Sequence, residues 1–313
     1  MLTALIVILI ALAVLLIAAL LCFFRVFYSP PRRPLGEGEY DKIPGRAYDP
    51  YREQIRKWQE TARAMDYTEH SVRSFDGLRL TAKLYDFDGE GPIELMAHGY
   101  RGTAERDMCG GIFRARELGH SAFLINHRAA ADSDGHVITF GAKERYDILT
   151  WINYINSLFD GKRKIILTGI SMGAATVMLA SAMELPPNVV GVLADCGYTS
   201  AEAIIKKVIR DMHLPPALCY PLVRLGALIY GGFDPNDASP VEALRNTHLP
   251  IIFVHGDADG FVPAYMSEEN YNACASENKR LLLIEGADHG LAYPKGQDDY
   301  VKEVREFFAY IKE

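Results

Sequence analysis

The chain has 313 residues, of which 49% are hydrophobic, which is enough for one large α/β domain with appendages or for two small domains. Its formal net charge of −7 argues against a nucleic-acid partner, because duplex binding needs a basic face. The five cysteines are scattered and form no Cys-x-x-Cys pair, which gives little support to zinc or dithiol chemistry and fits a reducing compartment.

The first segment, residues 1–28, is predicted to be a membrane anchor. Residues 2–24 carry no charge, and a run of about 20 apolar residues is the length that spans a bilayer as a helix. The alternative is a cleaved signal peptide, but no basic residue precedes the run and no small-x-small cleavage site follows it. Because Arg25, Arg32 and Arg33 follow the helix, the positive-inside tendency predicts a single pass with the remaining chain in the cytoplasm.

Residues 29–48 are rich in proline and glycine and are expected to form a semi-extended linker. A helix is predicted to follow, with Asp49 as its cap and Pro50 at its first position. We expect this helix to pack on the main domain, although its arginine-bearing face would also suit a membrane surface.

From about residue 71 the pattern alternates strands and helices. Two strands that flank Asp76-Gly77 predict a hairpin. Apolar or β-branched runs predict six further, buried strands, at 92–97, 121–126, 164–170, 189–194, 251–254 and 280–284. Helical patterns between them imply an α/β domain over 49–313, with a mostly parallel eight-stranded sheet covered by helices on both faces. In such sheets the chemistry lies at the carboxyl ends of the strands.

The strand at 164–170 ends in Gly169-Ile170-Ser171-Met172-Gly173, and a helix follows at once. A glycine-x-serine-x-glycine sequence between a buried strand and a helix predicts a sharp turn that lifts the Ser171 hydroxyl above the sheet. The glycines remove side chains where strand and helix approach closely. A chance glycine-rich turn is the alternative, and the strand–turn–helix context disfavours it.

A serine nucleophile needs a base, and the base needs a third group to orient it. His289 follows the last strand and is the only histidine late in the chain. Asp257 and Asp259 follow the preceding strand, and Asp195 ends an earlier one. An acid after one strand and a histidine after the next is the order that a catalytic triad needs. The other histidines are expected to be structural, and His255 is expected to shape a loop.

Three sequence stretches together resemble the α/β-hydrolase superfamily, most closely its bacterial esterase-like and prolyl-oligopeptidase-like branch. They are Gly-Ile-Ser-Met-Gly, His-Gly-Asp-x-Asp-x-x-Val-Pro and Gly-Ala-x-His-Gly, and the resemblance extends from about residue 71 to the C-terminus. It implies that the triad acid is the aspartate three residues before Val-Pro, which is Asp259. Asp257 is the second candidate and Asp195 a distant third.

Two backbone N–H groups must form the oxyanion hole of such a site. One is expected from Met172, directly after the nucleophile. The loop His98-Gly99-Tyr100 is similar to the family's His-Gly-x pattern and implies the Tyr100 amide as the second, although a plain tight turn would explain the same residues.

The loop at 128–133 departs from the family. Many relatives have an arginine, then a His-Gly pair, then a serine, whereas this chain has Ala131 in place of the glycine. Alanine lacks the freedom of glycine at positive φ, so a differently shaped loop is expected.

These residues predict a serine hydrolase that cleaves a carboxylic ester, a thioester or an amide through an acyl-enzyme on Ser171. No cofactor or metal is expected, because nucleotide-binding motifs are missing from the sequence and 257–260 lacks the later ligands of a calcium loop. An acyltransferase on the same triad and an inactive membrane-tethered binding protein are the alternatives.

The segment 198–249 is longer than an ordinary connection and is expected to form a helical cap. Its apolar second half would roof the pocket and favour a small-molecule substrate with an apolar group, or would only attach the cap to the domain.

Overall fold

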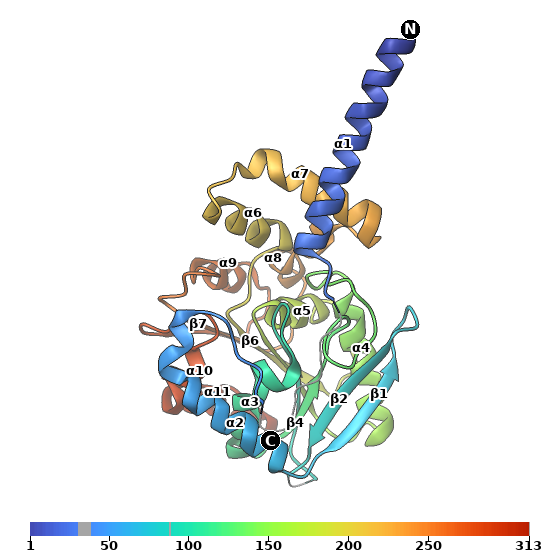
Figure 1. Cartoon of the computed structure of the whole chain (residues 1–313). Coiled ribbons are helices and arrows are strands. Elements are labelled where there is room, and N and C mark those ends of the chain that lie inside the picture. Colours follow the sequence, from blue (N-terminus) through green and yellow to red (C-terminus); the bar gives the residue numbers. More distant parts are fainter. Residues whose placement is uncertain (31–38, 88, 313) are drawn as a thin grey trace.

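The computed structural model describes residues 1–30, 39–87 and 89–312, which contain an eight-stranded sheet flanked by helices (Figure 1). The strands are β1 (Thr68–Arg73), β2 (Arg79–Tyr85), β3 (Ile93–Ala97), β4 (Ser121–Ile125), β5 (Ile165–Ile170), β6 (Val189–Asp195), β7 (Ile251–Gly256) and β8 (Lys279–Ile284). Their order is β1-β2-β4-β3-β5-β6-β7-β8. Strand β2 is antiparallel to both of its neighbours, and the other pairs are parallel. The predicted α/β architecture with a mostly parallel sheet is confirmed.

Helices cover both faces of this sheet. The α-helices are α1 (Leu2–Val26), α2 (Arg52–Ala64), α3 (Ala104–Leu118), α4 (Glu144–Leu158), α5 (Met172–Ala180), α6 (Ala201–Asp211), α7 (Pro216–Gly226), α8 (Pro240–Leu244), α9 (Tyr265–Ala273), α10 (Ala292–Lys295) and α11 (Gln297–Phe307). Shorter turns are η1 (Arg46–Tyr51), η2 (Ala227–Gly231), η3 (Pro235–Asp237) and η4 (Ala309–Lys312). Helices α4 and α5 pack on one face, and α3 and α11 pack on the other.

Alternation along the central strands explains why both faces are covered. In β7, Ile251 and Phe253 join the core beneath α4 and α5, whereas Ile252 and Val254 join the core beneath α11. Successive side chains of a strand point to opposite faces, so a continuous apolar run needs a helical layer on each side. The buried runs therefore predicted the three-layer arrangement correctly.

The helix predicted to begin at Asp49 begins later. Asp49 and Pro50 lie inside the 3-10 turn η1, and α2 starts at Arg52. The Asp49 carboxylate, which was expected to cap the helix, instead accepts a hydrogen bond from the Arg52 guanidinium, with Nε at 2.7 Å.

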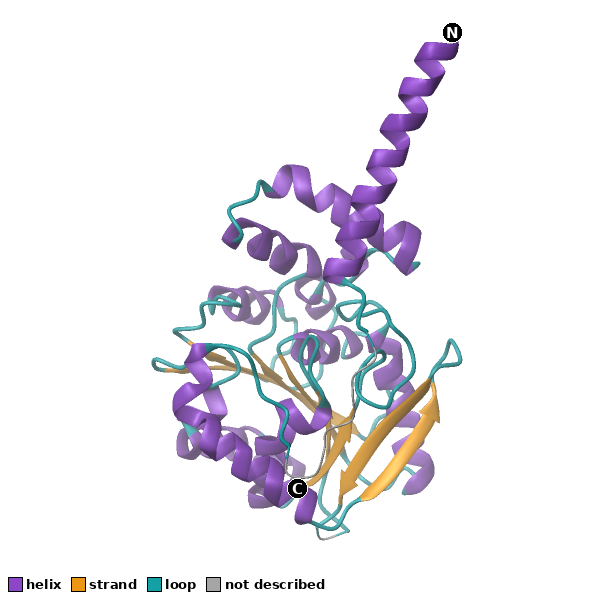
Figure 2. Cartoon of the chain, viewed as in Figure 1, coloured by secondary structure: helices purple, strands orange, loops and turns teal. Residues whose placement is uncertain are grey.

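Helix α1 is long and apolar enough to cross a membrane and is a candidate anchor (Figure 2). Its final turns pack against the cap formed by α6, α7 and η2. A Cβ at Gly226 would lie 2.4 Å from the carbonyl oxygen of Ala19, so glycine permits the close contact between α7 and α1. The Tyr230 hydroxyl donates to the Leu16 carbonyl at 3.1 Å. The C-terminal end of α1 is therefore part of the folded domain.

The linker predicted for 29–48 falls partly on residues 31–38, which lie outside the described residues. Arg32 and Arg33, on which the predicted membrane orientation depends, belong to that stretch.

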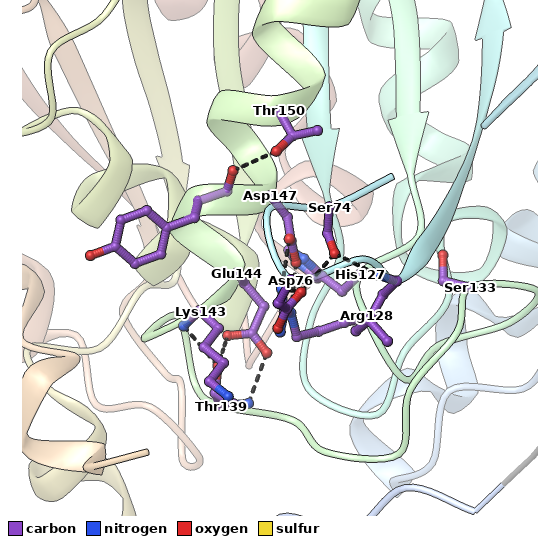
Figure 3. Close-up of polar contacts among 12 residues, drawn as sticks. Ser74, Asp76, His127, Arg128, Ser133, Thr139, Lys143, Glu144, Asp147 and Thr150 are labelled. Carbon is purple, nitrogen blue, oxygen red and sulfur yellow. Dashed lines mark hydrogen bonds and ion pairs between the residues drawn. The ribbon is translucent and has the colours of Figure 1, made fainter. Parts of the chain in front are cut away.

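A buried ion cluster holds the loop that departs from the family (Figure 3). The Arg128 guanidinium donates two hydrogen bonds to Asp147 on α4, both of 2.7 Å, and two to Asp76 in the β1–β2 turn, of 2.8 and 3.1 Å. Ala131 takes φ of 46°, so this loop reaches the left-handed conformation without glycine. That conformation costs a non-glycine residue about 1 kcal/mol, which the surrounding contacts must offset.

Candidate active site

The backbone at Ser171 forms a strained turn between β5 and α5. Ser171 has φ of 56° and ψ of −117°, and its N–H donates to the Asp195 carbonyl at 2.8 Å. A Cβ at Gly173 would lie 2.0 Å from the Ala97 carbonyl oxygen, and one at Gly169 would lie 2.3 Å from the backbone of Gly173. Both flanking glycines are therefore required by close backbone contacts, as their sequence positions predicted.

Three predicted site residues meet at the carboxyl ends of three strands. Ser171 follows β5, Asp259 follows β7 and His289 follows β8. The Ser171 hydroxyl lies 3.0 Å from His289 Nε2, and His289 Nδ1 lies 2.7 Å from Asp259 Oδ2. In this arrangement Nδ1–H donates to the carboxylate and Nε2 accepts from the hydroxyl, which is the geometry of a serine nucleophile with its general base.

The Asp259 carboxylate is buried but well supplied with donors. Its Oδ1 accepts the N–H groups of Phe261 and Val262, each at 2.8 Å. Burial alone would raise the pKa of Asp259, but hydrogen bonds from His255 and His289 outweigh it and hold that pKa below its usual range. The carboxylate is thus ionised at neutral pH and can orient the imidazole.

The two rival acids make other contacts. Asp257 is exposed and accepts the Gly286 N–H at 2.5 Å, which braces its loop against the turn before His289. Asp195 accepts the Tyr300 hydroxyl at 3.0 Å, and burial raises the pKa of its carboxyl. Of the three candidates, Asp259 is the one within hydrogen-bond distance of His289.

Sequence reasoning missed a second histidine on the same carboxylate. His255 is fully buried, and its Nε2 lies 3.1 Å from Asp259 Oδ2 and 2.8 Å from the Val262 carbonyl. Its Nδ1 accepts from the Ser267 hydroxyl at 2.6 Å. The available signal was its place at the end of β7, four residues before Asp259. His255 fixes the acid rather than only shaping a loop.

Tyr48 was also missed, because it lies in the stretch expected to be a linker. Its hydroxyl donates to the His289 carbonyl at 2.5 Å, across 241 residues of sequence. No local pattern could have indicated this contact. It holds the backbone that carries the base.

The candidate oxyanion hole is formed at the start of α5 and by the loop after β3. Within the described chain, the amides of Met172 and Tyr100 have no protein hydrogen-bond partner. The Gly99 N–H donates to Asp107 at 2.9 Å, and a Cβ at Gly99 would lie 3.5 Å from the Ser171 Cβ. The loop is therefore fixed beside the nucleophile with free N–H groups, as an oxyanion site needs.

The same loop is bonded to the end of the candidate anchor. The Tyr100 hydroxyl donates to the Val26 carbonyl at 2.6 Å. Arg101 donates to the carbonyls of Arg25 and Tyr28, at 3.0 and 2.9 Å. Helix α1 thus ends directly behind the loop that carries the Tyr100 amide.

A cavity of about 660 Å³ opens beside Ser171 and His289. Its apolar walls come mainly from the stretch before α2, from α2 itself and from α3 and α10: Ile43, Ala47, Tyr48, Ile55, Trp58, Cys109 and Tyr293. Among the described residues of the cap, Lys207 and Asp211 on α6 line the cavity. The expectation that the apolar second half of the cap roofs the pocket is therefore wrong: part of that half packs on α1, and another part, including Leu218 and Leu228, is exposed.

Cys196, Asp259 and His289 also bring three possible metal-ligand atoms within 4.8 Å of one another. Both ring nitrogens of His289 are already engaged, by Asp259 and Ser171. Burial raises the pKa of the Cys196 thiol well above its usual value, which disfavours the thiolate that binds metals. This chemistry favours a triad over a metal site.

Comparison with known proteins finds distant relatives, and no family model matches the chain. YqkD of Bacillus subtilis, an uncharacterized protein, is 24% identical over 192 residues, which cover 61% of this chain and 63% of YqkD. YNL320W of Saccharomyces cerevisiae, an uncharacterized membrane protein, is 23% identical over 193 residues, with coverage of 61% and 62%. The chain thus spans less than two thirds of the length of either relative.

Solved structures show the fold more fully. The Pyrococcus furiosus esterase Pf2001 superposes with a TM-score of 0.64 at 19% identity, covering 91% of this chain and 98% of the esterase. The chain therefore has the α/β-hydrolase fold. The prolyl-oligopeptidase-like branch that the sequence suggested stays a prediction.

Proposed function

We propose that this protein is a membrane-anchored serine hydrolase that cleaves a carboxylic ester through an acyl-enzyme on Ser171. The observation that carries the proposal is the continuous set of hydrogen bonds from the Ser171 hydroxyl through His289 to Asp259, set on a strained turn. A serine is a weak nucleophile by itself, and this arrangement supplies what activates it.

In the proposed mechanism, Ser171 attacks the ester carbonyl while His289 Nε2 takes its proton. The Met172 and Tyr100 amides stabilise the oxyanion of the tetrahedral intermediate. His289 then protonates the leaving alcohol, and an acyl-enzyme remains on Ser171. Water, activated by His289, attacks the acyl carbonyl, and collapse of the second intermediate returns the serine hydroxyl and releases the acid.

The cavity supports a substrate with an apolar group. Its walls include the side chains of Ile43, Ile55 and Trp58, with the indole stacked on Tyr293 at a centroid distance of 5.5 Å. Each methylene buried there would contribute roughly 0.8 kcal/mol, or about a fourfold gain in kcat/KM. The rise with chain length should stop when the cavity is full.

Labelling with a fluorophosphonate probe tests the nucleophile. Ser171→Ala is expected to abolish labelling and ester turnover, whereas the exposed Ser157→Ala serves as a matched control that keeps both. Turnover that survives in Ser171→Ala would refute the mechanism. A series of p-nitrophenyl esters from acetate to decanoate should show kcat/KM rising and then falling, and a steady fall from acetate onward would refute the apolar acyl site.

The membrane orientation is tested separately. We propose that α1 crosses the membrane once and leaves the hydrolase domain in the cytoplasm. A reporter fused after residue 313 should then resist external protease in intact cells. Its digestion without permeabilisation would reverse the orientation.

A further inference from the structure

Large apolar side chains are exposed on the cap, close to the candidate anchor. They lie in α7, in η2 and in the turn before α7, and we call them the cap apolar face: Met212, Leu214, Leu218, Leu228 and Ile229. Leu218 is 71% exposed, which is more than any other large apolar residue described after α1. Large apolar side chains exposed along one cap helix and its two flanking turns mark a candidate binding face.

The position of α1 relative to the cap indicates what covers this face. Residues 2–15 of α1 are exposed, and contact with the cap begins at Leu16, whose carbonyl accepts from Tyr230. At 1.5 Å per residue, residues 2–15 extend only about 21 Å, whereas the hydrocarbon core of a bilayer is about 30 Å thick. The free part of α1 is therefore too short to span that core.

A spanning α1 must use the part that the cap contacts. About 20 residues are needed, so the hydrocarbon must reach the level of Leu21, which is itself 65% exposed. Gly226 of α7 abuts Ala19, and Tyr230 of η2 donates a hydrogen bond to Leu16, so the cap is fixed at that level. If α1 is tilted, more of its residues lie within the hydrocarbon core, and the bilayer then comes still closer to the domain.

We propose that the cap apolar face is embedded in the leaflet nearest the hydrolase domain, beside α1. The inference rests on the proposed membrane span of α1. The bilayer is favoured over a second copy or a protein partner because it must already surround α1 where α7 and η2 pack on it. Interfacial helices bury an apolar face at this depth, between headgroups and acyl chains.

Tryptophan fluorescence in nanodiscs tests this placement with the full chain. Tryptophan would be introduced singly by Leu218→Trp and Leu228→Trp, with the two native tryptophans as a constant background. Leu9→Trp in α1 is the positive control. Leu158→Trp is the negative control, because it is exposed at the end of α4, near the start of β5 and opposite the catalytic edge. Each variant is measured in phosphatidylcholine nanodiscs with and without brominated acyl chains, and fluorophosphonate labelling confirms the fold.

Bromine is expected to quench at least half of the added emission at positions 9, 218 and 228 and almost none at 158. If position 9 is quenched while 218 and 228 behave like 158, the inference is overturned and the anchor stands. Contact with a second copy or a protein partner would give that same result. If position 9 is also unquenched, the proposed membrane span fails and the inference with it.

Discussion

The contact between Tyr100 and the end of α1 predicts that a hydroxyl bonded to that helix, and not to Ser171 or His289, affects catalysis. Tyr100→Phe removes the 2.6 Å hydrogen bond to Val26 but keeps the ring and the backbone amide. A bond of this type contributes about 1 kcal/mol net. If all of this free energy is lost from the stabilisation of the transition state, kcat should fall about fivefold. The ties from Arg101 to the same helix end remain, so the loop is loosened rather than lost.

The assay compares kcat and KM for one p-nitrophenyl ester with the full chain in nanodiscs. KM should stay near its original value, because an oxyanion donor acts mainly on the transition state. Tyr310→Phe is the matched control, since its hydroxyl donates to the Val190 carbonyl at 2.8 Å far from the site. Both variants should lose similar thermal stability, but only Tyr100→Phe should lose kcat. Equal kcat values for the two variants would refute the idea that the end of α1 supports the proposed oxyanion loop.

Three further predictions concern the acid and two buried ion clusters. Asp259→Asn should lower kcat by a factor on the order of 10⁴, whereas Asp257→Asn should cost little; the reverse pattern would show that the acid is misassigned. Burial alone would raise the pKa of Glu94, but Arg114 and His120 lower it from 4.5 to about 2. The contribution of the Glu94 carboxylate to the unfolding free energy is therefore complete above pH 4.5 and is lost as the pH falls through 2. Chemical unfolding should show about 3 kcal/mol lost over that window, and Glu94→Gln should remove this dependence; an unchanged pH profile would contradict the assignment. Arg128→Met should reduce the unfolding free energy by about 3–5 kcal/mol, because it leaves the buried Asp147 without its main partner; a calorimetric loss under 1 kcal/mol would argue against the cluster.

The sheet and the strained turn at Ser171 could be predicted because their signals are local. A buried parallel strand needs a continuous apolar run, and a turn as tight as that at Ser171 needs glycines on both sides. The two other residues of the proposed triad follow strand ends, and the fold brings those ends to one edge. Strand positions and one family resemblance were therefore enough to predict Ser171, Asp259 and His289 as candidate site residues.

Contacts between distant segments left no such signal. Periodicity indicates that a residue is buried but not which element covers it. The apolar residues of the cap predict a pocket roof, whereas those of α7 partly pack on α1 and partly stay exposed, because all these surroundings suit the same residue types. Tyr48 was placed in a linker, since a short 3-10 turn has too few residues to show a period. His255 was dismissed because a histidine before glycine is common in plain turns.

The catalytic edge and the proposed membrane surface lie on the same side of the molecule. If the hydrocarbon ends near Leu21, Val26 lies about 7 Å further along α1, within the thickness of a headgroup layer. The Val26 carbonyl accepts the hydrogen bond from Tyr100, whose amide belongs to the candidate oxyanion hole. Lys207 and Asp211 line the cavity from α6, which packs against α7. With this placement the proposed acyl cavity would begin beneath the headgroups, and an ester dissolved in the leaflet would reach Ser171 without crossing bulk water.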